Sequence, residues 1–179
     1  MIAESCELRN KLLEVGIRQK LFTLISECPG LHFRDVQRRT EAATGNLSYH
    51  LEHLVKAGLL ETVRDGKYLR YYACNEMSVE QIGILKLARL KTDRHILLFL
   101  LQNETSTNEQ LSEILHLSPS TVSWHIKKLV NAHILNASAV GRKIIYSIRD
   151  SELVSRVLIK YKESFLDILV DRFVEMWEL

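Results

Sequence analysis

The stretch Leu117–Tyr146, LSPSTVSWHIKKLVNAHILNASAVGRKIIY, decides the fold because it predicts a capped helix followed at once by a short hairpin. Ser118 is placed to cap the helix, and Pro119 occupies the first helical position, where its missing N–H costs nothing. Apolar residues then recur at helical spacing as far as Ile134, after which the period changes from 3.6 toward 2.

The predicted helix has two distinct faces. Val122, Ile126, Leu129 and His133 share the face expected to enter the core. The opposite face carries hydroxyls, an indole and two ammonium groups, supplied by Ser120, Thr121, Trp124, Lys127, Lys128 and Asn131. A polar, basic surface of this kind suits a DNA major groove, with phosphates at its walls and base edges at its floor. His125 lies at the border, where contact with DNA and a hydrogen bond to the scaffold are equally expected.

The hairpin is expected to join strands at residues 135–139 and 144–148 through a turn at Gly141. Arg142 and Lys143 would then stand at the tip, where cations reach a phosphate or a minor groove. The alternative is a solvated tip without a ligand.

This pattern occurs twice. A shift of 75 residues lays residues 47–75 on residues 122–150 without a gap. The identical pairs include core, helix-face and turn positions: Ser48/Ser123, His50/His125, Leu54/Leu129, Val55/Val130, Ala57/Ala132, Leu60/Leu135, Gly66/Gly141 and Tyr71/Tyr146. Because an amphipathic period alone would not also align the turn glycine and the following tyrosine, the repeat indicates two copies of one unit.

Three motifs carry a resemblance to a known family: PG-x-HFR at residues 29–34, YHL at residues 49–51 and STVSWHIKKL at residues 120–129. With them, residues 16–150 resemble archaeal tandem winged helix-turn-helix regulators of the wider ArsR/MarR-like superfamily. The resemblance implies sequence-specific DNA binding, with contacts from the helix opening at Thr44 and from its second copy. The cysteine-rich signature of ArsR metal sensors is missing, so no metal site is expected.

The expected fold class is mainly α with small β-wings (α+β): two tandem winged helix-turn-helix domains plus a long C-terminal helix. We expect an N-terminal domain with an added helix at residues 1–75, a helical connector at 76–91, a second domain at 92–150 and a C-terminal helix at 151–179. A capping box at Ser78–Gln81 favours the helical connector, and Thr107–Gln110 forms a second capping box.

The resemblance implies DNA contacts from Asn46, Tyr49 and His50 in the first copy and from Ser120, Thr121, Trp124 and His125 in the second, and neighbouring polar and basic residues complete the candidates. In the second they are Ser118, Ser120, Thr121, Trp124, His125, Lys127, Lys128, Arg142 and Lys143, and in the first they are Arg38, Arg39, Thr44, Asn46, Tyr49, His50, Arg64 and Lys67. Tyr49 and Trp124 are expected on the solvent face, where a large aromatic ring favours DNA over interdomain packing. Glu52 and His53 replace the two lysines of the second unit, which is therefore expected to dominate affinity.

Chain length, net charge and cysteine content bear on the class of protein. The chain has 179 residues, a net charge of +2 and only three cysteines, Cys6, Cys28 and Cys74, which favour reduced thiols over a disulfide framework. No apolar run is long enough for a membrane span, so we expect a cytoplasmic protein, associated with the nucleoid when bound to DNA. Scattered histidines without paired ligands predict no metal or other cofactor, and no catalytic constellation predicts an enzyme.

Residues 151–179 contain neither glycine nor proline and predict one long helix with an apolar seam. The seam runs through Val154, Leu158, Tyr161, Phe165, Leu169, Phe173 and Met176. Such a seam favours a homodimer, and the alternative is packing on residues 3–15 of the same chain.

Two functions are therefore compared. The first is a transcription regulator that binds promoter or operator DNA through two winged helices per chain. The second is a tandem winged-helix interaction module of a chromosome-segregation or transcription-initiation assembly, whose helices would meet protein. The basic residues of the second unit favour the regulator, whereas its operator, the sign of regulation and any small-molecule effector leave no signature in the sequence.

Overall fold

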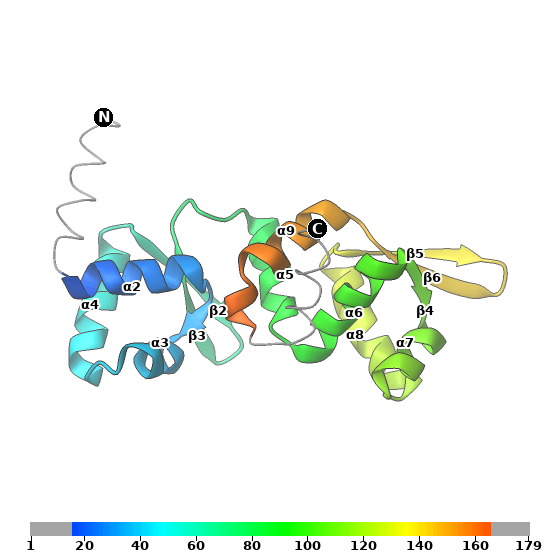
Figure 1. Cartoon of the computed structure of the whole chain (residues 1–179), viewed down its shortest axis with the longest axis horizontal. Helices are drawn as coiled ribbons and strands as arrows, with labels where there is room; N and C mark the ends of the chain where they lie inside the picture. Colours follow the sequence, from blue (N-terminus) through cyan, green and yellow to red (C-terminus); the bar gives the residue numbers. More distant parts are fainter. Residues whose placement is uncertain (1–15, 166–179) are drawn as a thin grey trace. The chain divides into compact units, whose positions relative to one another are not determined.

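The computed structural model describes residues 16–165 of the chain, which divides into two compact units at Ser78 and Val79 (Figure 1). The first unit contains α2 (Gly16–Glu27), β1 (Leu31–His32), α3 (Phe33–Thr40), α4 (Thr44–Lys56), β2 (Leu60–Asp65) and β3 (Tyr68–Ala73). Its strands form one antiparallel sheet in the order β1-β3-β2. The helix predicted at residues 3–15 lies outside the described residues.

The second unit repeats this order. It contains α5 (Val79–Ala88), α6 (Lys91–Asn103), β4 (Thr105–Thr107), α7 (Asn108–Leu115), α8 (Pro119–Asn131), β5 (Leu135–Val140), β6 (Lys143–Ile148), α9 (Ser151–Lys160) and a 3-10 helix, Lys162–Ser164. Its sheet has the order β4-β6-β5. Both units confirm the predicted winged helix-turn-helix fold, an α+β architecture in which three helices carry a small sheet and a hairpin wing.

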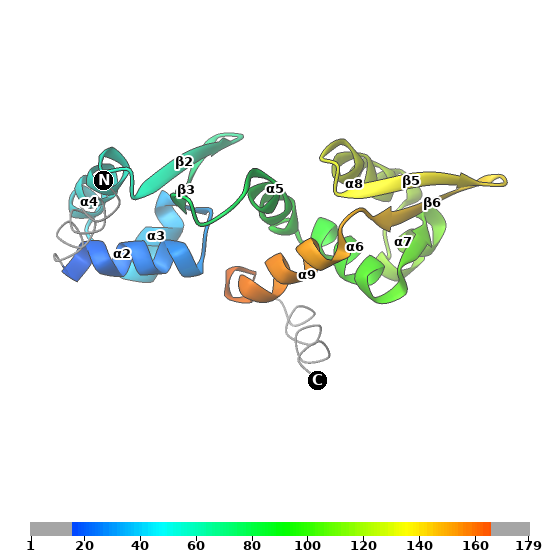
Figure 2. The ribbon, with the colours of Figure 1, turned by 90° about the horizontal axis from the view of Figure 1, so that it is seen from above.

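The repeat extends through almost the whole unit. The bounds of α3, α4, β2 and β3 coincide with those of α7, α8, β5 and β6 after a shift of 75 residues. Each wing turns at a glycine in the left-handed region, Gly66 at φ 59° and Gly141 at φ 61°. Ordinary side chains are strained at such angles, which explains why both copies carry glycine there. In Figure 2 the hairpin of β5 and β6 projects beyond the helices of its own unit.

Each unit has its own core, built from the apolar faces of its helices and the base of its wing. The core-facing side of α4 in the first unit buries Leu47, Leu51 and Leu54. The same side of α8 in the second unit buries Val122, Ile126 and Leu129. Burial of these faces orients the opposite face of each helix toward solvent. His133, predicted on the core face, is exposed, because α8 ends at Asn131 and His133 adopts a left-handed conformation beyond it.

Three other elements differ from expectation. The predicted connector at residues 76–91 contains α5, which belongs to the second unit and packs against α6 and α9. The short strand β4 was not predicted. The helix predicted over residues 151–179 ends at Lys160, where a turn precedes the 3-10 helix. Residues 166–179 lie outside the described part of the chain.

Candidate nucleic-acid interface

Helix α8 has the cap and the two faces predicted for it. The Ser118 hydroxyl accepts a hydrogen bond from the Thr121 N–H at 3.2 Å, and Pro119 follows at the first helical position. Ser120, Thr121 and Lys127 are exposed on the face opposite the core. Trp124 is 59% exposed on the same face. The indole is thus accessible to a partner molecule from solvent.

A buried carboxylate lies behind this face. Asp93, in the first turn of α6, has no exposed surface, and its Oδ1 lies 2.5 Å from the Nδ1 of His125. Its Oδ2 lies 2.5 Å from the Nζ of Lys128, as an ion pair whose angle does not meet hydrogen-bond geometry. A buried carboxylate needs such partners because its desolvation is otherwise uncompensated. Asp93 therefore fixes two side chains of α8 to α6.

The same contacts continue to the exposed indole. The Nζ of Lys128 lies 4.7 Å from the centroid of the Trp124 ring, and the His125 ring meets that indole edge-on at 4.8 Å. A cation over the ring face and a perpendicular neighbour each favour one orientation of the ring. Trp124 is thus exposed but held in place by His125 and Lys128, and both of these side chains are positioned by Asp93.

The wing of the second unit presents cations at its tip. Arg142 lies in the turn and Lys143 pairs with Val140 at the end of the hairpin, and both are exposed. Within the described residues, neither side chain makes an ion pair, and Lys127 on the helix makes none. These three cations are therefore available to an external anion.

The first unit builds a related but different helix face. Tyr49 is 59% exposed at the position of Trp124, and its ring meets His50 edge-on at 5.2 Å. His50 is only 8% exposed, and burial lowers its pKa, as do the nearby charges of Arg18 and His53. Arg18 occupies the position of Asp93, and His53 that of Lys128. The buried acid of the second unit is thus absent from the first.

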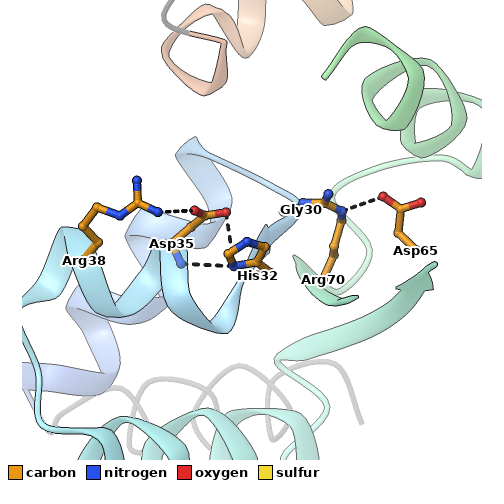
Figure 3. A network of polar contacts seen from close by, with 6 residues as sticks. All are labelled: Gly30, His32, Asp35, Arg38, Asp65 and Arg70. Atoms are coloured by element: carbon orange, nitrogen blue, oxygen red, sulfur yellow. Dashed lines mark hydrogen bonds and ion pairs between the residues drawn. The ribbon is translucent and has the colours of Figure 1, made fainter. Parts of the chain in front are cut away.

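The wing of the first unit is held by contacts of residues near its turn, and Figure 3 shows the polar ones. Arg70 donates from Nε to Asp65 at 2.8 Å and from a terminal nitrogen to the Gly30 carbonyl at 3.0 Å. The ring of Tyr68 stacks on His32 at 4.8 Å. His32 also caps α3 by accepting from the Asp35 N–H at 3.2 Å. These contacts tie the wing to the helix-turn-helix and leave Arg64 and Lys67 exposed.

The structure divides the predicted site residues into two groups. Those exposed on a helix face or wing are Asn46, Tyr49, Arg64, Lys67, Ser120, Thr121, Trp124, Lys127, Arg142 and Lys143. The others each make a contact within the fold, although Arg38, Arg39, Thr44 and Ser118 are exposed as well: Arg38 with Asp35, Arg39 with Cys28, Thr44 with Gln37, His50 in the core, Ser118 in its cap, and His125 and Lys128 with Asp93. Lys128, predicted to bind DNA, is partly exposed and forms an ion pair with Asp93.

The sequence analysis did not identify Asp93 and Arg18, because each affects a recognition helix that lies about thirty residues later in the chain. Asp93 and His125 are separated by 32 positions. The sequence did contain one signal. When the 75-residue shift is extended to α2 and α6, Arg18 aligns with Asp93, so the two copies carry opposite charges at this position.

Comparisons with known proteins agree with this geometry. A family described as winged helix-turn-helix DNA-binding matches residues 89–136, and one described as an N-terminal HTH domain matches residues 16–84. The chain is 29% identical over 143 residues to a protein of Methanocaldococcus jannaschii named as an uncharacterized HTH-type transcriptional regulator. That match covers 80% of this chain but only 36% of the other protein.

Two solved structures are also similar. HlyU from Vibrio cholerae is 21% identical, with a TM-score of 0.43, over 50% of this chain and 96% of its own. The transcriptional repressor PagR of Bacillus anthracis is 26% identical, with a TM-score of 0.40, over 44% of this chain and 88% of its own. Scores this low carry no conclusion about function.

Proposed function

We infer that this chain, which carries two winged helix-turn-helix domains, is a sequence-specific DNA-binding transcription regulator that uses both domains. The observation that carries the inference is the exposed face of α8, where Trp124 is held in one orientation beside the unpaired cation of Lys127. A rigid aromatic ring reads base edges and thymine methyl groups, whereas a free cation binds phosphate without regard to sequence.

The wings complete the proposed interface. In this arrangement Arg142 and Lys143 contact the DNA backbone or an adjacent minor groove while α8 enters the major groove. Tyr49 and Asn46 of α4, together with Arg64 and Lys67 of the first wing, take the corresponding places in the first unit. One chain thereby addresses two segments of a promoter or operator, as a cytoplasmic protein without a catalytic role.

A protein-interaction module is the less favoured function. It would not need unpaired cations on both a recognition helix and the adjoining wing, because protein-binding surfaces are depleted in lysine at their centres. The relative named as a transcriptional regulator also agrees with DNA binding.

Dimerisation is a separate part of the proposal. The first part of the predicted seam, Val154, Leu158, Tyr161 and Phe165, is buried, and α9 packs on α5 and α6. A homodimer formed through the C-terminal segment would therefore use Leu169, Phe173 and Met176. Sedimentation of the whole chain and of a variant ending at Phe165 tests this point, because only the whole chain should dimerise.

The proposed function is tested by fluorescence anisotropy with the chain's own promoter fragment and a scrambled fragment across a salt series. We expect tighter binding to the promoter and a steep loss of affinity with salt, since each neutralised phosphate releases counterions. Equal affinity for both fragments would reject sequence-specific regulation through this promoter. Absence of binding at low salt would favour the protein-interaction module.

A further inference from the structure

In the described part of the first unit, three buried side-chain nitrogen atoms have no hydrogen-bond partner. The Nε of Arg18, the Nδ1 of His50 and the Nδ1 of His53 are each buried without a hydrogen-bond partner. None of the three residues makes an ion pair with another described residue. Buried polar groups normally find partners, because an unpaired group retains the full cost of desolvation.

In the second unit, the matching positions hold one acidic and two basic side chains. At the matching positions, Asp93 contacts His125 at 2.5 Å and Lys128 at 2.5 Å, so an acid on α6 joins two basic groups on the recognition helix. The bounds of the helices correspond after the same shift, and α2 packs against α4 as α6 packs against α8. In the first unit Arg18 replaces the acid, and the charges of Arg18 and His53 both act on His50. Among the residues that the structure describes, no carboxylate pairs with any of the three side chains.

We propose that Arg18, His50 and His53 form an oxyanion site in the first unit, occupied by a phosphate group of the DNA backbone. This proposal rests on the proposed function. The guanidinium and the two imidazoles supply N–H donors of the kind that bind phosphate oxygens. Arg18 and His53 are partly exposed, so a phosphate oxygen would reach the site from the side of these two residues, whereas His50 lies buried behind them.

The position of the group favours DNA as the source of the phosphate. His50 and His53 lie on the recognition helix, and the exposed ring of Tyr49 lies 5.2 Å from His50 and 6.3 Å from His53. A phosphate held here would fix the backbone beside the residue proposed to read bases. Contacts of this type set the register of a protein on the duplex.

The test compares Arg18→Gln with Arg18→Asp, which supplies the carboxylate found in the second unit. Lys20→Gln serves as the matched control, because Lys20 is exposed on the same helix. Anisotropy across a salt series should give a slope lower by about one for both Arg18 variants, the value for one lost phosphate contact, and a smaller change for Lys20→Gln. Thermal unfolding of each variant verifies that it is folded.

A second measurement separates the possible anions. Histidine ring NMR signals of the DNA-free chain are followed as sodium phosphate replaces sodium chloride at constant ionic strength. If phosphate shifts the His50 and His53 signals in the natural chain but not in Arg18→Asp, while the salt slopes stay equal, the site holds a free anion and DNA as its source is rejected. Unchanged slopes and unchanged signals together would overturn the site. If the natural chain binds no DNA, the proposed function fails, and the NMR titration still decides whether an oxyanion binds.

Discussion

The Oδ1 of Asp93 lies 2.5 Å from the Nδ1 of His125, and this contact joins α6 to the recognition helix α8. Asp93 is fully buried, whereas Trp124, the next residue before His125, is largely exposed. A contact inside the unit therefore controls the orientation of a side chain on the surface proposed to read DNA. In the first unit Arg18 precludes the same arrangement.

Replacing Asp93 with Asn should destabilise the second unit, because Lys128 and His125 would lose the carboxylate that compensates their partial burial. Removing one partner of a buried ion pair costs on the order of 3 kcal/mol. Urea denaturation followed by Trp fluorescence measures the loss. Glu152→Gln is a suitable control, since Glu152 and Arg156 form an exposed pair at 3.8 Å whose loss should cost about 0.5 kcal/mol or less. Equal stability of both variants would show that Asp93 is no anchor.

The two neighbouring lysines of α8 should respond differently to substitution. Lys127→Gln should leave stability nearly unchanged and reduce the salt slope of DNA binding by about one, because the side chain is exposed and unpaired. Lys128→Gln should chiefly reduce stability, since its Nζ lies against Asp93. Thermal unfolding and anisotropy on the same two proteins measure both effects. If the effects were reversed, the ion pair would not persist in solution.

Trp124→Ala should reduce discrimination between promoter and scrambled DNA while leaving the salt slope unchanged. The indole carries no charge, and loss of one base-reading side chain costs about 1–3 kcal/mol of discrimination. Competition anisotropy with both fragments gives this difference directly. Trp124→Tyr, which supplies the residue found at the matching position of the first unit, should retain part of the preference. Loss of affinity for both fragments by the same factor would assign Trp124 to general binding instead.

The sequence predicted those features that depend on neighbouring residues. Ser118 and Pro119 fixed the start of α8, and Gly66 and Gly141 fixed the two wings, because caps and tight turns need particular residues at particular places. The end of α9 at Lys160 has no such marker, since neither glycine nor proline occurs in residues 151–179. The pairing of Asp93 with His125 was equally inaccessible, because it depends on the approach of two helices rather than on a local motif.

Stability of the first unit should fall as the pH is lowered below about 6.5, the ordinary pKa of histidine. Burial lowers the pKa of His50 in the folded chain, and Arg18 and His53 lower it further. Above pH 6.5 the folded and unfolded states both hold His50 neutral, so it contributes no dependence on pH. Below pH 6.5, His50 is protonated in the unfolded state but still neutral in the folded state. The free energy of unfolding therefore decreases as the pH falls, until the pH passes the pKa of His50 in the folded chain.

His50→Gln removes this contribution and should therefore lose less stability than the natural chain between about pH 7.5 and pH 5.5. Urea titrations at both pH values, followed by the amide NMR signals of α4, isolate the first unit from the second. His116→Gln, at an exposed position of the second unit, is the matched control and should leave the difference unchanged. An identical loss in the natural chain and in His50→Gln would show that another group sets the acid sensitivity of this unit.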